Sequence, residues 1–180
     1  EELQRAWHAI EAEVLAREWE RSHDPWNAIN ASSHWRKAAK PTSALGLTNE
    51  ALTKAGSDAK ARSALLTTRG GALRDLSNLD EAKAMGLEAH ALTPKDFRPC
   101  TLLGAVHIEL GDLMGGREWY LNAEKLGSDR HSIDEDLRAL LSRTSRSQRQ
   151  RIIELLIAQD AERFGRLLKK SRTRRTVCHD

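Results

Sequence analysis

The side chains that most often do chemistry in enzymes are scattered along this chain. No histidine is paired with a cysteine or a carboxylate at a recognisable catalytic spacing. Cys178-His179 supplies only two possible zinc ligands, and no four-ligand zinc spacing occurs. The glycine pairs Gly70-Gly71 and Gly115-Gly116 fit close helix packing better than a phosphate-binding loop. The sequence therefore predicts no catalytic residue, no metal site and no cofactor, and we expect that the protein is not an enzyme.

Composition indicates a water-soluble chain. The 180 residues are 31% charged and have a mean hydropathy of −0.60, which is typical of one domain or a compact part of a larger protein. No run of 18 apolar residues is present to span a membrane, and the first residues do not form a signal peptide. The first residue is not Met, from which we expect a piece of a longer protein. Cys100 and Cys178 do not make a disulfide framework, and two free thiols favour the cytoplasm.

Positive charge is concentrated near the C-terminus. Residues 138–175 hold 12 Lys/Arg and three Asp/Glu, a net charge of +9 in a chain whose total is +3. Such density can neutralise phosphates, which makes nucleic-acid binding an alternative function. The residues that we expect to carry it are Arg149, Arg151, Arg163, Arg166, Lys169 and Lys170. A solvated, solubilising cap is the competing interpretation and the one we favour, because charge runs are often only solvated.

Apolar spacing and breaking residues predict an all-α fold. Leu3, Trp7, Ile10 and Val14 recur every three or four residues and mark one apolar helix face. Asp24-Pro25 is a strong helix start. No alternating strand pattern is found. The expected helices cover 1–21, 25–39, 42–55, 59–76, 79–92, 97–110, 114–126, 132–141, a segment around 148–157 and 160–170, followed by a polar tail over 171–180.

Capping residues support several of these boundaries. Gly56-Ser57-Asp58 ends one helix and caps the next. Ser132 and Glu135 have the spacing of a capping box, and Ser145 and Gln148 have it again. These pairs predict helices that begin at about residue 132 and just after residue 145.

The middle of the chain repeats at a spacing of 34 residues. Gly70 is matched by Gly104, and Ala89 is matched by Ala123. Further matched pairs are Leu76 and Leu110, Leu79 and Leu113, Leu87 and Leu121, and Leu92 and Leu126. A fixed period of this length indicates stacked supersecondary units.

The repeated unit resembles the tetratricopeptide repeat. Counting from Ser63, the small residues Gly70, Ala82 and Ala89 and the residue Pro94 fall at the positions that the family pattern requires. The next unit matches at Gly104, Tyr120 and Ala123. The resemblance implies a right-handed α-solenoid of about three helix-turn-helix units with capping helices. We expect an N-terminal cap over 1–24, units over 25–58, 59–95 and 96–130, a C-terminal cap over 131–170 and a tail over 171–180.

This resemblance also implies where a partner would bind. In the family, the first helices of successive units line a concave groove that holds an extended peptide or a helix. The corresponding positions here give the expected partner-binding residues Arg36, Thr67, Arg74, Arg98, Thr101 and Ile108. The arginines are expected to pair with carboxylates of the partner; ordinary solvated surface is the alternative. The fold alone says little about function, so the predicted role is a non-catalytic protein-interaction module or scaffold.

Other residues have structural interpretations. Trp7, Trp19, Trp26, Trp35 and Trp119 are expected to pack between helices rather than to stack on bases. His107 replaces a packing aromatic and is expected to be a hydrogen-bonded core histidine. Self-association through exposed ends of the stack is a further possibility.

Overall fold

The described part of the chain is entirely helical. The structure is a computed structural model that describes residues 1–162, 164 and 165, without the side chain of Gln159. The helices formed by these residues are α1 (Glu2–Ser22), α2 (Pro25–Lys37), α3 (Pro41–Lys54), α4 (Ala59–Asp75), α5 (Leu79–Leu92), α6 (Phe97–Glu109), α7 (Leu113–Lys125), α8 (Arg130–Arg143) and α9 (Arg146–Gln159). No strand occurs within these ranges. The predicted all-α class is therefore confirmed for them. Most of the expected helix over 160–170, and the tail over 171–180, lie outside the described residues.

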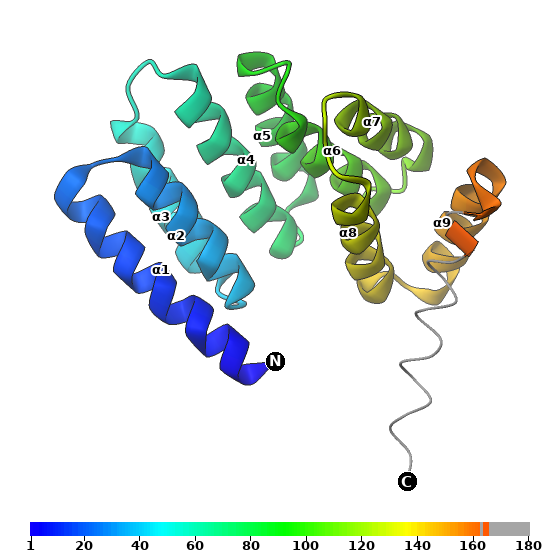
Figure 1. Ribbon diagram of the computed structural model, residues 1–180, viewed down its shortest axis with the longest axis horizontal. Coiled ribbons are helices and arrows are strands. Elements are labelled where there is room, and N and C mark those ends of the chain that lie inside the picture. Colours follow the sequence, from blue (N-terminus) through cyan, green and yellow to red (C-terminus); the bar gives the residue numbers. More distant parts are fainter. Residues whose placement is uncertain (163, 166–180) are drawn as a thin grey trace, which may run out of the picture.

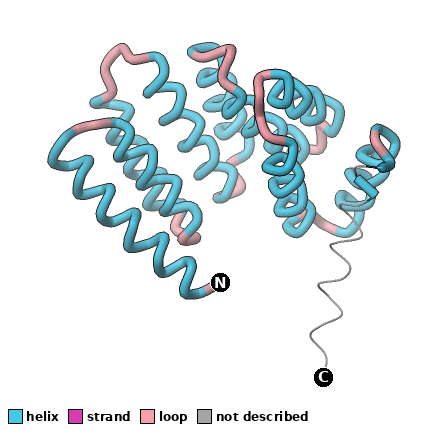
Figure 2. Tube along the Cα trace, viewed as in Figure 1, coloured by secondary structure: helices cyan, strands magenta, loops and turns pink. Residues whose placement is uncertain are grey.

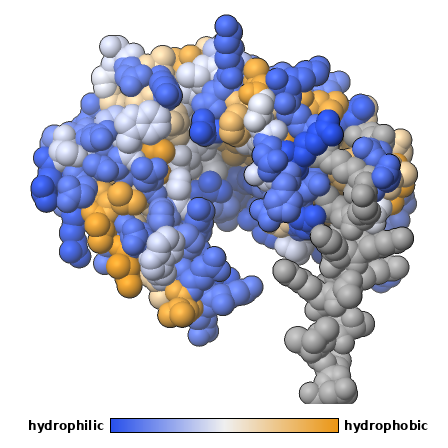
Figure 3. Space-filling model, viewed as in Figure 1, coloured by the Kyte–Doolittle hydropathy of each residue, from blue (hydrophilic) through white to orange (hydrophobic). Residues whose placement is uncertain are grey.

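Consecutive helices lie side by side in a curved row. α1 packs on α2, α4 on α5 and α6 on α7, and contacts between α2 and α4, α4 and α6, and α6 and α8 join these pairs. Figure 1 shows the row as an arch that begins with α1 and ends with α9, and Figure 2 shows that only short loops connect its helices. The space-filling view is hollowed beneath the arch (Figure 3).

Short polar side chains start most of these helices. Asp24, Asp58, Asp96 and Asp129 each accept a hydrogen bond from a backbone N–H of the first turn of α2, α4, α6 and α8. Such caps satisfy donors that have no partner within a helix. Ser145 caps α9 in the same way through Gln148 N–H, as its spacing predicts.

The predicted start of the eighth helix is wrong. The helix begins at Arg130, and its cap is Asp129 rather than Ser132. Ser132 instead donates its backbone N–H to the Asp129 carboxylate at 3.0 Å. An ionised carboxylate is a stronger acceptor than a serine hydroxyl, and it is favoured by the positive end of the helix dipole. Asp129, which precedes Ser132 by three residues, therefore caps α8 in place of the predicted capping box.

Small residues let the helix pairs approach closely, as the repeat pattern predicts. A Cβ atom at Gly116 would lie 2.7 Å from the carbonyl oxygen of Gly104, and a Cβ at Gly104 would lie 2.8 Å from the Tyr120 ring. Gly70 is similarly closed in by Ala82 and Leu102. These contacts explain why helix interiors tolerate glycine, whose presence there costs about 1 kcal/mol relative to Ala.

The core is divided along the row. One buried cluster joins Trp19 of α1 to α2, α3 and α4, and another joins Leu73 of α4 to Val106 of α6. A third cluster runs from α6 to α9 and includes Leu140 and Ile152. This division is expected when each element buries its apolar surface mainly against its immediate neighbours.

The expected buried face of α1 is not the one that the structure buries. Ala12 and Trp19 point into the core, whereas Leu3, Ile10 and Val14 are exposed. Leu3, Ile10 and Val14 lie on the opposite side of the helix. The Trp7 ring is half-exposed, but it lies 5.5 Å from the His34 ring of α2. Helical spacing identifies an apolar face, but it does not say which face meets the neighbouring helix.

Candidate functional site

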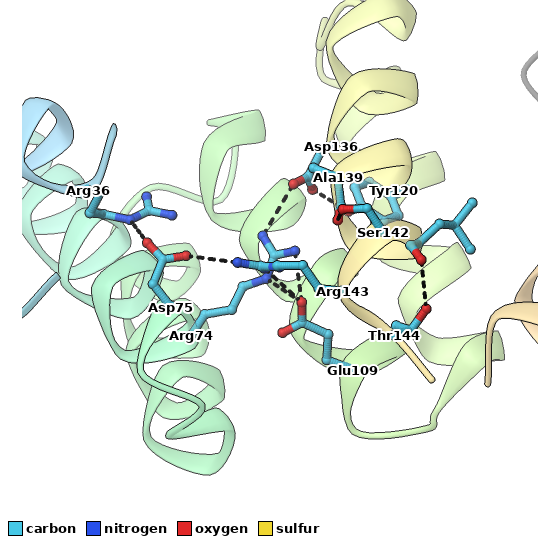
Figure 4. Close-up of polar contacts among 11 residues, drawn as sticks. Arg36, Arg74, Asp75, Glu109, Tyr120, Asp136, Ala139, Ser142, Arg143 and Thr144 are labelled. Carbon is cyan, nitrogen blue, oxygen red and sulfur yellow. Dashed lines mark hydrogen bonds and ion pairs between the residues drawn. The ribbon is translucent and has the colours of Figure 1, made fainter. Parts of the chain in front are cut away.

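A network of arginines and carboxylates joins the C-terminal ends of four helices. Its charged members are Arg36 of α2, Arg74 and Asp75 of α4, Glu109 of α6, and Asp136 and Arg143 of α8, and Tyr120 of α7 completes it (Figure 4). We call this set the arginine–carboxylate network. The ends of α2, α4 and α8 border the hollow beneath the arch (Figures 1 and 3). We call the surface that faces this hollow the inner face. The arginine–carboxylate network therefore lies on the inner face.

Arg74 is the buried centre of the network. Its side chain is 7% exposed and lies 3.1 Å from Glu109 Oε1 and 3.2 Å from Asp136 Oδ1. The Tyr120 hydroxyl donates to the other oxygen of Asp136 at 2.5 Å. Burial lowers the pKa of Arg74, but Asp136 and Glu109 outweigh that effect and raise it above its ordinary value. Burial, followed by the Asp136 charge, raises the pKa of Tyr120 well above its usual range.

Arg36 and Arg143 form the accessible part of the network. Arg36 Nε donates to Asp75 Oδ2 at 2.7 Å, and its guanidinium covers Gly71, where a side chain would overlap it. Arg143 reaches the second oxygen of Asp75 at 3.4 Å and Glu109 at 3.0 Å. The two side chains are 29% and 48% exposed. Both guanidiniums therefore reach solvent while Asp75 and Glu109 fix their positions.

Donor groups remain in this network after its internal pairs are made. Arg36 uses only Nε in the hydrogen bonds of the described residues, which leaves both of its Nη groups. Arg74 Nη2 is buried within ion-pair distance of Glu109, but it makes no hydrogen bond there. Three arginines balance three carboxylates, so the network adds no net charge. Chemically it can present fixed N–H donors to the carboxylates or carbonyls of a bound segment.

Only part of this network follows from the sequence. Arg36 and Arg74 were predicted as partner-binding residues, whereas Asp75, Glu109 and Arg143 were not recognised. A signal for these three exists, because they are spaced by 34 residues, and each is the last residue of its helix, α4, α6 or α8. The structure brings these two acids and this base together, because Arg143 pairs with both Asp75 and Glu109.

The remaining predicted groove residues differ in their surroundings. Arg98 is exposed and pairs with Asp96, and Thr101 donates its hydroxyl to the Arg98 carbonyl. Thr67 donates to the Ser63 carbonyl of its own helix. Ile108 is buried in the core cluster between α6 and α9, so it is not available on the inner face. The structure thus joins Arg36 to Arg74 through Asp75, Arg143 and Glu109, and it leaves Arg98, Thr67 and Thr101 outside that network.

The nucleic-acid candidates are mostly outside the described residues. Arg163, Arg166, Lys169 and Lys170 lie there. Arg149 donates to the Leu141 carbonyl at 2.7 Å and to the Thr144 carbonyl at 3.2 Å, which caps the end of α8. Arg151 is exposed. One of the two described candidates therefore has a structural role.

A cysteine of α6, a histidine of α5 and an asparagine of α7 lie close together, but they do not form a nucleophilic site. Cys100 Sγ lies 3.6 Å from His90 Nδ1, and Asn122 Nδ2 donates to the sulfur at 3.4 Å. Burial raises the pKa of the Cys100 thiol despite this hydrogen bond, and the residue has no exposed surface. A buried neutral thiol is a poor nucleophile.

Several residues have the structural roles that were predicted for them. His107 is buried and pairs through Nδ1 with Asp112 Oδ2 at 2.8 Å. Trp19 is fully buried, and Trp119 packs edge-on against His90. Trp7 is half-exposed, but its ring lies 5.5 Å from the His34 ring of α2. Trp26 is an exception, because it is 39% exposed.

Two further features are absent from the described residues. No helix among them is long and apolar enough to cross a membrane. Within the same residues, no group of three or more His, Cys, Asp or Glu side chains is arranged to hold a metal ion.

Comparison with known proteins does not assign the chain to a family. No protein-family model matches it, and a search of curated proteins finds no match.

Proposed function

We propose that this chain is a stack of tetratricopeptide-like helix pairs, α2–α3, α4–α5 and α6–α7, continued by α8–α9. The second helices of the pairs begin at residues 41, 79, 113 and 146, and each first helix has an Asp cap. Both regularities support a repeated unit of about 34 residues. The close contact of Gly104 with Gly116 and Tyr120 supports it too, because small residues stand where the repeat pattern has them.

The proposed function is non-catalytic binding of a partner segment on the inner face. The observation that carries it is the pair of solvent-reaching guanidiniums, Arg36 and Arg143, held on either side of Asp75. Fixed guanidiniums lose little conformational freedom on binding and present paired donors to planar carboxylates. We therefore infer that the partner is an extended segment with Asp or Glu side chains.

Arg36 and Arg143 are also the residues through which the proposal can be tested. Arg74 is unsuitable for that purpose, because removing a buried member would change folding as well as binding. Substitution by Gln removes the positive charge without adding a new negative charge beside Asp75. Arg130→Gln is a matched control, since Arg130 is an exposed arginine at the opposite end of the helix that carries Arg143.

The experiment selects binding peptides from a random displayed library with the full chain. The affinities of the selected peptides are then measured by calorimetry. We expect selected sequences enriched in Asp and Glu, and at least about a tenfold loss of affinity in the Arg36→Gln/Arg143→Gln variant. Arg130→Gln should bind like the unmodified chain.

Two outcomes would count against the proposal. The first is a selection that yields no binder. The second is a set of peptides whose affinity is the same for the Arg130→Gln control and for the double variant. A mixed-sequence oligonucleotide is measured in parallel. Tight, salt-sensitive binding of this probe without any peptide binding would favour the nucleic-acid alternative instead.

A further inference from the structure

The first half of α1 makes few buried contacts with the rest of the row. Ala12 and Trp19 are the buried residues of this helix, and no residue before Ala12 is buried. Among residues 1–10, only His8 and Ala9 are half-buried, and the Trp7 ring beside them is half-exposed. The packing of residues 2–11 on α2 therefore depends mainly on the short segment 7–9.

A pair of histidine rings joins the two helices at this segment. His8 Nδ1 of α1 lies 3.2 Å from His34 Nδ1 of α2, which is within hydrogen-bond distance. The Trp7 ring lies against both rings, with its centroid 4.8 Å from that of His8 and 5.5 Å from that of His34. The first half of α1 is thus attached to α2 through a partly buried contact between two titratable groups.

The hydrogen bond between the two rings depends on how many protons they carry. A neutral histidine has one N–H and one accepting nitrogen, so one Nδ1 donates to the other when both rings are neutral. One added proton preserves this contact, because an imidazolium still donates to a neutral ring and the Trp7 ring can stabilise its charge. A second proton removes the only acceptor and places two positive charges side by side. The contact is therefore lost when both rings are protonated.

The surroundings of His34 make the second proton unfavourable while α1 is attached. Burial, followed by the positive charges of His8 and Lys37, lowers the pKa of His34 below its ordinary value of 6.5, and Glu11 of α1 opposes this effect. When the first half of α1 leaves, the charge of His8 and part of the burial leave with it. The released state therefore binds the second proton more readily than the attached state does.

Other charges of the neighbouring elements do not reverse this preference. Glu1 and Arg5 line an open hollow beside the histidine pair and have opposite signs. On the side of α2 that faces α4, Arg36 is paired with Asp75. Lys40, which precedes α3, lies over a tryptophan ring of α2. The response of the pair to acid is therefore set by the groups that act directly on His34.

We propose that the His8–His34 pair is a pH-sensitive switch that holds the first half of α1 on α2. Because the released state binds more protons than the attached state, the attachment is complete above about pH 6.5 and weakens as the pH falls below it. Buried Trp19 keeps the second half of α1 in the core, so the opening is local to residues 2–11. The switch uses neither Arg36 nor Arg143, and it is independent of partner binding on the inner face.

The first test measures hydrogen exchange of the full chain by mass spectrometry at about pH 7.5 and about pH 5.5. Residues 5–11 are followed, because Arg5 N–H is the first amide of α1 with a partner inside the helix. After correction for the effect of pH on the chemical step of exchange, their protection should fall at least about threefold in acid, whereas that of α4 and α6 should not change. Glutamates remain mostly ionised at about pH 5.5, so they do not cause this fall.

Two matched variants show whether the histidine pair causes the fall. His8→Gln removes one of the two charges, and the Gln amide can either donate to His34 or accept from it. Protection of residues 5–11 in this variant should be the same at both pH values. His131→Gln is the control, because His131 is an exposed histidine of α8, and it should keep the threefold fall. Circular dichroism verifies that both variants are folded.

The second test follows the ring protons of His34 by NMR as the pH is lowered. The titration midpoint of His34 should be higher in His8→Gln than in the unmodified chain, because the positive charge of the protonated His8 is gone. A role of His8 in packing alone would not move this midpoint. His131→Gln should leave it unchanged.

Three results would overturn the proposal. One is protection of residues 5–11 that is the same at both pH values in the unmodified chain. Another is a fall in protection that His8→Gln shows to the same extent as the unmodified chain. The third is a His34 titration midpoint that is the same in both proteins, which would mean that the two rings do not influence each other's protonation.

Discussion

At the scale of single residues, Arg74 was predicted to lie on the surface but is buried. Glu109 of α6 and Asp136 of α8 enclose its guanidinium. A charge can be buried there because it is paired on both sides. The ion pairs that Arg36 and Arg143 make with Asp75 and Glu109 are more exposed to solvent, so their contribution to stability should be small.

This difference predicts the stabilities of two matched variants. Arg74→Met should lower the free energy of unfolding by about 3 kcal/mol, because it leaves Glu109 and Asp136 without their central partner. Arg36→Met should lower it by at most about 1 kcal/mol, since its pair with Asp75 is partly exposed. Urea denaturation of both variants measures the difference. Equal losses would mean that Arg74 is not the centre of the network.

The cap of α8 makes a prediction about acid. A hydrogen bond from the Ser132 backbone N–H, and lesser ones from His131 and the Ser132 hydroxyl, lower the pKa of Asp129 below its ordinary value of 3.8. The carboxylate is therefore more ionised in the folded chain than in the unfolded chain. Its stabilising effect is complete above that ordinary value and disappears as the pH falls through the lowered pKa.

Asp129→Asn isolates this effect, because Asn is an equally good cap that does not titrate. The melting temperature of the unmodified chain should exceed that of the variant at about pH 6, and the gap should close toward about pH 3. Thermal melts of both proteins across this range measure it. A gap that is constant with pH would show that the charge of Asp129 does not stabilise the cap.

At the scale of helices, glycine has opposite effects at different positions. Gly116 of α7 lies against the backbone of α6, where a Cβ would be 2.7 Å from the Gly104 carbonyl oxygen. Gly46 of α3 has no atom within 4 Å of the place where a Cβ would stand. The first glycine is needed for packing between helices, whereas the second only lowers the stability of its helix.

Two alanine substitutions should therefore change stability in opposite directions. Gly46→Ala should raise the free energy of unfolding by about 0.5–1 kcal/mol through helix propensity and a less flexible unfolded chain. Gly116→Ala should lower it by about 1–3 kcal/mol, because α6 and α7 must move apart. Chemical denaturation gives both values. A neutral Gly116→Ala would show that the α6–α7 spacing can adjust freely.

At the scale of the whole molecule, the row of helices should not be equally stable along its length. Inner helices are covered on two sides, while α1 has an uncovered apolar stripe and α9 contributes to the wall of an open cavity. Stability in such a row depends on nearest-neighbour contacts, so opening should begin at the ends.

Hydrogen exchange measured by mass spectrometry should show this gradient. The backbone amides of α4 to α7 should exchange most slowly, and those of α9 should exchange fastest among α2 to α9. The gradient would be contradicted if the backbone amides of all helices exchanged at the same rate.

The sequence determined the helices and many of their boundaries. Pro25, Asp58 and Ser145 act locally, through fixed φ or a side-chain acceptor within three residues, so their effects can be read without the fold. The spacing of 34 residues likewise indicated which glycines would meet a neighbouring helix. Ser132 was misread because Asp129 competes for the same N–H groups.

The tertiary structure alone decided which side of each helix is covered. Leu3, Ile10 and Val14 have the spacing of a buried face, but α2 packs mainly on the opposite side of α1, where Trp19 lies. Arg36 and Arg74 have the spacing of free groove residues, but Asp75, Glu109 and Asp136 reach them from elements up to 62 residues away. Local sequence fixes the backbone of a helix because its hydrogen bonds span four residues. The partner of a face or a charge is fixed by contacts between helices, which depend on how the whole row packs.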